Sequence, residues 1–202
     1  MKLNKKWYGK EYFKGYTKQA ETYNKNQYRK LLKKLEKYRK NNILLEVGSA
    51  YGWLLEVARE KKWGTCGIEI SKHACDVAEE RGKGVYWGTV EENIDNIEED
   101  FDVIIMINVI EHMENPIGTL KLLYGKLREG GIIYITCPNS DYIYGETENE
   151  RHEHLWQFTI DNMKETLKKA GITNFNITLR NPIRITIGRI KHEIIQKIRS
   201  ND

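Results

Sequence analysis

The stretch that decides the fold is Leu44-Leu45-Glu46-Val47-Gly48-Ser49-Ala50-Tyr51-Gly52. The apolar run from Ile43 to Val47 predicts a buried strand, and the residues after Gly52 place apolar side chains at helical spacing. Glycines at such a turn let the backbone approach a ligand closely, and the helix N-terminus offers free N–H groups to an anionic group. The stretch therefore predicts a strand, a ligand-binding turn and a helix, with a merely structural turn as the alternative.

The rest of the chain repeats this alternation of short apolar runs and amphipathic stretches. We expect strands over residues 43–47, 64–70, 85–87, 103–107, 132–136, 172–179 and 183–187. One intervening helix is expected to start at Pro116 and run through Leu127, before Gly130-Gly131 turns the chain into the next strand. The pattern predicts an α/β fold with a doubly wound, mostly parallel seven-stranded sheet and helices on both faces.

Composition places the chain among proteins with one α/β domain. It has 202 residues, of which 40% are hydrophobic and 31% charged, and no apolar run approaches the roughly 18 residues that span a bilayer. The N-terminus has no apolar export signal, so a cytoplasmic location is expected. Three cysteines without metal-ligand spacing are expected to be reduced.

Charge is distributed unevenly along the chain. Residues 1–40 hold 14 Lys and Arg against 3 Asp and Glu, whereas residues 41–179 hold 13 against 24. We therefore expect a basic, aromatic-rich arm and helix over residues 1–41, followed by the main domain over residues 42–202. Packing of this arm against the acidic body is the first expectation, and binding of RNA, acidic lipid surfaces or a phosphorylated substrate are the alternatives.

Glu69 narrows the kind of ligand. It ends the second expected strand, 21 residues beyond Gly48, which is the spacing at which an acidic group takes ribose hydroxyls. A dinucleotide-binding turn would need glycine where Ala50 and Trp53 stand, so the turn disfavours a nicotinamide dinucleotide.

Several motifs in order resemble class I S-adenosylmethionine-dependent methyltransferases. The pattern Glu46-x-Gly48-x-x-x-Gly52 is similar to that family's first motif, and Glu69 matches its ribose acid. The segments 101–112 and 127–131 resemble its fourth-strand segment and the turn before its fifth strand. The segment 153–159 is similar to one in a small-molecule subgroup that includes quinone-biosynthesis methyltransferases. The resemblance covers about residues 42 to 171.

The resemblance implies S-adenosylmethionine as cofactor and S-adenosylhomocysteine as product. It assigns the methionyl end to Glu46 and the backbone of Gly48, Ser49, Ala50, Tyr51 and Gly52, with Asn108 and Val109 beneath it, the ribose to Glu69, and the adenine to Ile70, Thr89 and Val90. Thr89 stands where many family members carry Asp to receive the adenine amino group, so its hydroxyl or backbone would have to substitute.

Methyl transfer from a sulfonium chiefly requires alignment and exclusion of water, and a base is needed only when the acceptor arrives protonated. Candidate bases are His112, His154 and His152, because histidine titrates near neutral pH and these residues follow expected strand ends. Structural roles in loops are the alternative. Tyr142 and Tyr144 are expected to form a lid over the acceptor together with the aromatic residues of the arm. Packing without contact to the acceptor is the alternative.

The sequence favours methylation of a small-molecule acceptor, with oxygen slightly preferred. The alternatives are an RNA methyltransferase that uses residues 1–41 and a non-catalytic binding protein of the same fold. No metal is expected, because Asn108 stands where some quinone-type relatives carry Glu and use a metal. Oligomeric state is not predicted.

Overall fold

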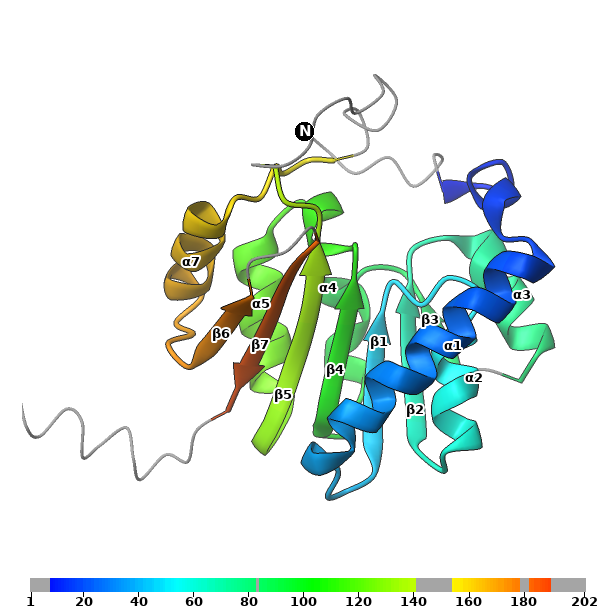
Figure 1. Cartoon of the computed structure of the whole chain (residues 1–202), viewed down its shortest axis with the longest axis horizontal. Coiled ribbons are helices and arrows are strands. Elements are labelled where there is room, and N and C mark those ends of the chain that lie inside the picture. Colours follow the sequence, from blue (N-terminus) through cyan, green and yellow to red (C-terminus); the bar gives the residue numbers. More distant parts are fainter. Residues whose placement is uncertain (1–7, 83, 141–153, 179–181, 190–202) are drawn as a thin grey trace, which may run out of the picture.

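The computed structural model describes residues 8–82, 84–140, 154–178 and 182–189. Seven strands form one sheet in the order β3-β2-β1-β4-β5-β7-β6 (Figure 1). Strands β1 to β5 are parallel to one another, and β7 runs antiparallel to both β5 and β6. The strands are β1 (Ile43–Val47), β2 (Gly64–Glu69), β3 (Val85–Trp87), β4 (Phe101–Ile107), β5 (Leu127–Cys137), β6 (Phe175–Thr178) and β7 (Ile183–Gly188). The predicted seven-stranded, mostly parallel sheet is confirmed.

Two apolar clusters lie against the sheet. Along β1, Leu44 belongs to one cluster and Leu45 to the other, because successive side chains of a strand point to opposite faces. The Leu44 cluster includes side chains of α1 (Lys18–Leu35), α2 (Trp53–Glu60) and α3 (Lys72–Glu80). The Leu45 cluster includes α4 (Val90–Asn93), α5 (Pro116–Gly125) and α7 (Ile160–Lys169). Four 3-10 helices complete these elements: η2 (Tyr12–Gly15), η3 (Glu36–Tyr38), η4 (Ile94–Asn96) and η5 (Ile110–His112).

Two predicted boundaries are wrong. The helix that starts at Pro116 ends at Gly125, and Leu127 instead starts β5, where it pairs with Phe101 and is fully buried. Gly130 and Gly131 therefore lie within β5, where an irregularity in the β4 pairing accommodates them. The predicted helix could not be told from the strand at this point, because a buried leucine suits either.

The short helix α4 was not predicted. Thr89 starts it with a capping box, in which its hydroxyl accepts a hydrogen bond from the Glu92 N–H and the Glu92 carboxylate accepts one from the Thr89 N–H. At four residues, α4 is too short to show a helical period in the sequence.

The basic helix α1 packs beside α2 through ion pairs. Lys25 lies 2.5 Å from Glu56 and Arg29 lies 3.0 Å from Glu60, measured between charged atoms. The Arg39 guanidinium donates to the carbonyl oxygens of residues 61 and 62. Part of the basic charge of residues 1–41 is therefore paired with the body, and a lid or substrate-capping role for these residues stays a prediction. None of the helices that the structure describes is long and apolar enough to cross a membrane.

Asp102 connects the arm to the sheet. Its buried carboxylate accepts hydrogen bonds from the backbone N–H groups of Lys40, Asn41 and Asn42, and it forms an ion pair with Arg128. Burial acts to raise the pKa of Asp102, but the Arg128 guanidinium and the three N–H groups hold it below the ordinary value. One carboxylate thus fixes the entry into β1.

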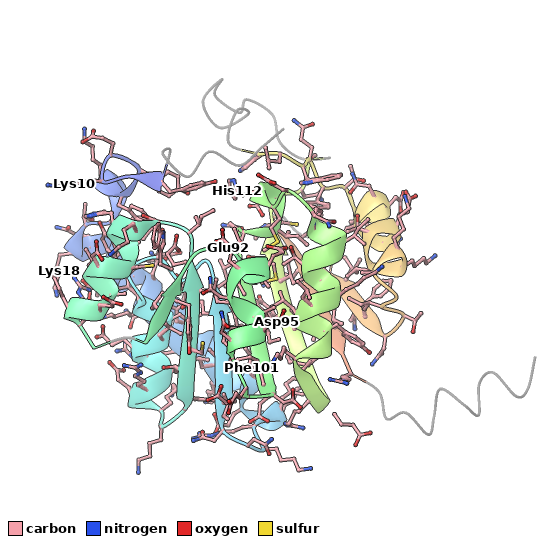
Figure 2. All side chains as sticks on the ribbon, turned by 180° about the vertical axis from the view of Figure 1, so that it is seen from behind. Lys10, Lys18, Glu92, Asp95, Phe101 and His112 are labelled. Atoms are coloured by element: carbon pink, nitrogen blue, oxygen red, sulfur yellow. The ribbon has the colours of Figure 1, made fainter. Side chains whose placement is uncertain are left out.

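The strand order places a candidate site at one end of the sheet. Strand order reverses between β1 and β4, and ligands of open α/β sheets bind outside the carboxyl ends of strands at such a point. Figure 2 shows His112 at this end, opposite Phe101, which starts β4.

Candidate functional site

The turn after β1 has a backbone that glycine favours. Gly48 and Gly52 have φ angles of +71° and +68°, and Ala50 between them has +47°. The Gly48 N–H donates to the Ile68 carbonyl at 2.8 Å, which ties the turn to the end of β2. A side chain at Gly48 would also collide with the segment between β4 and η5, because its Cβ would lie 2.4 Å from Val109 Cγ2. The turn therefore brings bare backbone to the candidate site.

Glu69 supports this turn from the end of β2. Its side chain is buried, and its two oxygens accept hydrogen bonds from the N–H groups of Ala50 at 2.7 Å and Ser71 at 2.8 Å. Burial raises the pKa of Glu69, and these N–H groups, with that of Ile70, oppose the rise. The carboxylate retains lone pairs that can accept hydrogen bonds from a ligand.

Glu46 lies on β1 and Asn108 directly follows β4, the two strands that flank the switch point. The Glu46 side chain is buried. Burial is the main cause that raises the pKa values of Tyr16 and Tyr28, and the negative charge of Glu46 adds to the rise. Asn108 is exposed, has a φ of +53°, and donates its N–H to the Thr136 carbonyl at 2.9 Å. Both residues line the same cavity.

The expected adenine edge is arranged differently from the family pattern. The Thr89 hydroxyl, expected to replace the missing Asp, is engaged as the cap of α4. Glu92, whose carboxylate is held at 2.8 Å by the Thr89 N–H, also lines the cavity there (Figure 2). Ile70 and Val90 lie on either side of this edge, and the Ile70 carbonyl accepts from the Trp87 indole at 3.1 Å.

A cavity of about 680 Å³ joins these elements. Every predicted cofactor residue except Gly52 lines it, together with aromatic residues of the N-terminal segment. Five glutamates are among the described residues that line it, and none of those residues is a lysine or arginine: Glu46, Glu69, Glu91, Glu92 and Glu114. The charge of this wall suits a cationic ligand.

Aromatic rings of the N-terminal segment form a wall of the cavity and pack against the glycine turn. The Phe13 ring stacks on Tyr51 with centroids 5.0 Å apart, and the Tyr16 ring lies 4.9 Å from Trp53. Tyr8 continues this wall towards His112, with a centroid separation of 6.1 Å. The sequence indicated aromatic residues near the acceptor, but it gave no signal that Trp53 and Tyr28 also line the cavity.

Two of the three candidate histidines lie together. His112 lines the cavity, and His154 lies behind it with ring centroids 4.9 Å apart. The segment that carries His154 is held on η5, because Trp156 donates its backbone N–H to the Glu111 carbonyl and its indole N–H to the Met113 carbonyl. His152, Tyr142 and Tyr144 lie outside the described residues.

Glu111 is a residue to which the sequence assigned no role. Its side chain is 2% exposed, and neither carboxylate oxygen has a hydrogen-bond partner in the part of the chain that the structure describes. Burial raises the pKa of Glu111 to about 8. One potential ligand atom each of Glu111, His112 and His154 lie within 4.8 Å of one another, a spacing that would also suit a metal ion. The expectation of no metal stays a prediction.

Comparison with known proteins gives one family. The family model described as a methyltransferase domain matches residues 16–177. A ubiquinone biosynthesis O-methyltransferase of Parvibaculum lavamentivorans is 30% identical over 108 residues, which are 47% of this chain and 43% of that protein. The chain thus matches less than half the length of this curated relative.

Solved structures share the fold at low sequence identity. The plantazolicin methyltransferase BamL, solved with a substrate analogue and S-adenosylhomocysteine, has a TM-score of 0.63 at 14% identity, over 74% of this chain and 77% of that one. A methyltransferase from Archaeoglobus fulgidus that depends on S-adenosylmethionine has a TM-score of 0.60 at 19% identity, over 88% and 85%.

Proposed function

Because the chain belongs to the methyltransferase-domain family and uses S-adenosylmethionine, we propose that it transfers the methyl group to a small-molecule acceptor, with oxygen as the favoured atom. The observation that carries this proposal is the position of His112, which lines the cavity beside the turn residues and Asn108. The helices on both faces of the sheet support the further assignment to the doubly wound class.

The residues present fit this cofactor. Glu69 can accept hydrogen bonds from two ribose hydroxyls, and the turn at Gly48 leaves the space that a methionyl chain needs. Glu46 and Asn108 are placed to hold the amino-acid end, and the acidic wall complements a sulfonium cation. When bound, S-adenosylmethionine supplies an electrophilic methyl group. The chain's own residues then align the acceptor and exclude water.

The aromatic wall supports a small acceptor over RNA. Tyr8, Phe13 and Tyr16 bring the N-terminal segment to the cavity, while Lys25 and Arg29 of the following helix are paired with α2. A helix that binds nucleic acid would need such lysine and arginine side chains to contact phosphates instead of glutamates.

His112→Ala is expected to leave the affinity for S-adenosylhomocysteine within about threefold and to lower methylation of phenol or catechol acceptors by roughly 100-fold or more, because general-base assistance is lost. Calorimetry measures the first quantity, and product formation from a panel of such acceptors measures the second. Micromolar binding is expected for the wild type, and a folded protein that fails to bind S-adenosylhomocysteine would contradict the proposed function. If the variant methylates these acceptors as fast as the wild type does, His112 is not the general base.

Gly48→Ala is expected to lower the affinity for S-adenosylhomocysteine by roughly tenfold or more. The new methyl group meets Val109 and forces the turn to shift, and the positive φ angle adds about 1 kcal/mol of strain. Gly82→Ala is the matched control, because Gly82 has a φ of +69° but open space around its Cβ position. Calorimetry should therefore separate the two variants, and equal affinities would contradict a close approach at Gly48.

A further inference from the structure

We propose that Glu111 is a positioning residue that works as a pair with His112. Its buried carboxylate stabilises His112 as the imidazolium that forms when His112 takes the hydroxyl proton of the acceptor. The proposal rests on the proposed function, which places His112 at the acceptor, and it adds a residue that does not line the cavity itself.

The surroundings of Glu111 give it one obvious partner. A buried carboxylate without hydrogen bonds is costly, and such a group calls for a cation or a proton. Glu111 Oε1 lies 4.0 Å from His112 Nε2, a separation that a small rotation of either side chain closes. Hydrogen bonds of catalytic groups are often long before the substrate is bound and shorten in the complex.

Apart from the histidines, no titratable group near the pair can place a positive charge beside Glu111. Cys137 lies at the end of β5, and burial, followed by the negative charge of Glu111, raises the pKa of its thiol, so it stays neutral. His154 packs on His112 from the segment held on η5, the Tyr8 ring faces His112 from the N-terminal segment, and Glu114 follows on the same loop. Among these groups, only the histidines can become cations.

The reaction balances with this pair. The acceptor oxygen forms a bond to the methyl carbon while the bond from that carbon to sulfur breaks, and its electron pair stays on sulfur. The O–H bond of the acceptor breaks, and the proton goes to a ring nitrogen of His112. The resulting imidazolium lies beside Glu111, which is ionised on the alkaline side of its raised pKa, and the proton later leaves to solvent. No oxidant or further reactant is needed.

The pair is tested by titrating the histidine rings in the complex with S-adenosylhomocysteine, using protein labelled with carbon-13 at histidine. In the wild type, the His112 signal is expected to titrate above the ordinary imidazole value, because the neighbouring Glu111 carboxylate favours the imidazolium. Glu111→Gln keeps the size and removes the charge. The midpoint is then expected to fall by about one pH unit or more, to the ordinary imidazole value or below. His112→Gln removes the signal of His112 and so identifies it among the five histidines.

Glu165→Gln is the control, because this exposed carboxylate on α7 pairs only with Lys169 among the described residues and should leave the midpoint unchanged. An unchanged His112 midpoint in Glu111→Gln would overturn the pair. Stoichiometric metal in the purified wild type that is absent from Glu111→Gln would also overturn it, in favour of a metal site. Calorimetry with S-adenosylhomocysteine tests the proposed function separately. If the protein does not bind S-adenosylhomocysteine, the His112 ring can still be titrated in the free protein, so the pair is tested in either case.

Discussion

Replacing Glu69 with alanine is expected to weaken binding of S-adenosylhomocysteine by roughly 100-fold or more. Two hydrogen bonds from ribose hydroxyls to a carboxylate are lost, at about 1.5–3 kcal/mol each. The same change removes the acceptor for the N–H groups of Ala50 and Ser71, so the glycine turn loses its support. Calorimetry measures the affinity, and Glu80→Ala, an exposed position on α3, should bind as the wild type does. An affinity within threefold of the wild type would reject the ribose assignment.

The affinity of the wild type should also fall on acidification. Burial raises the pKa of Glu69, and the ribose hydroxyls donate to its ionised form. Binding strength is therefore complete well above this raised pKa and is lost as the pH falls through it, at a higher pH than for an ordinary glutamate, whose pKa is about 4.3. Calorimetry at several pH values should show this loss in the wild type and little of it in Glu69→Ala.

Replacing Asp102 with alanine is expected to lower the free energy of unfolding by about 3–5 kcal/mol, because it leaves the partly buried Arg128 guanidinium without its carboxylate partner and three N–H groups without their acceptor. Urea denaturation measures the change. Asp100→Ala alters an exposed carboxylate two residues away and is expected to cost less than about 0.5 kcal/mol. A loss below 1 kcal/mol for Asp102→Ala would show that the arm is fixed in another way.

The contribution of Asp102 also has a definite pH range. Its folded-state pKa lies below the ordinary value of about 3.9, so its contribution is complete above that value. It is lost as the pH falls through the lowered pKa. The difference in unfolding free energy between wild type and Asp102→Ala should therefore be constant at neutral pH and shrink in acid.

The cofactor half of the candidate site was predictable because its signals are local. Glu46, Gly48 and Gly52 lie within one strand and turn, and Glu69 follows at a fixed distance set by one helix and one strand. Buried parallel strands give short apolar runs, so β1 and β4 could be located within about two residues. Gly130-Gly131 misled because glycine marks a strand irregularity as readily as a turn.

The acceptor half was less predictable because it depends on contacts between distant segments. His112 and His154 are separated by 42 positions, and their meeting depends on the hydrogen bonds of Trp156 to η5. Glu111 reads in the sequence as an ordinary loop carboxylate, and only packing reveals that its oxygens are buried. The role of Thr89 as a helix cap could not be predicted either, because α4 is too short to show a helical pattern in the sequence.

The acidic wall of the cavity gives the proposed reaction a simple charge balance. Before transfer, the positive charge within this wall is on sulfur; after transfer to a hydroxyl acceptor, it is on the ring of His112, beside Glu111. The net charge within the acidic wall therefore stays the same during transfer, because the sulfonium cation is replaced by the imidazolium cation. The attraction of the wall to sulfur ends at transfer, and when the proton then leaves to solvent, the negative charge of the wall is again unbalanced and ready for the next sulfonium cation.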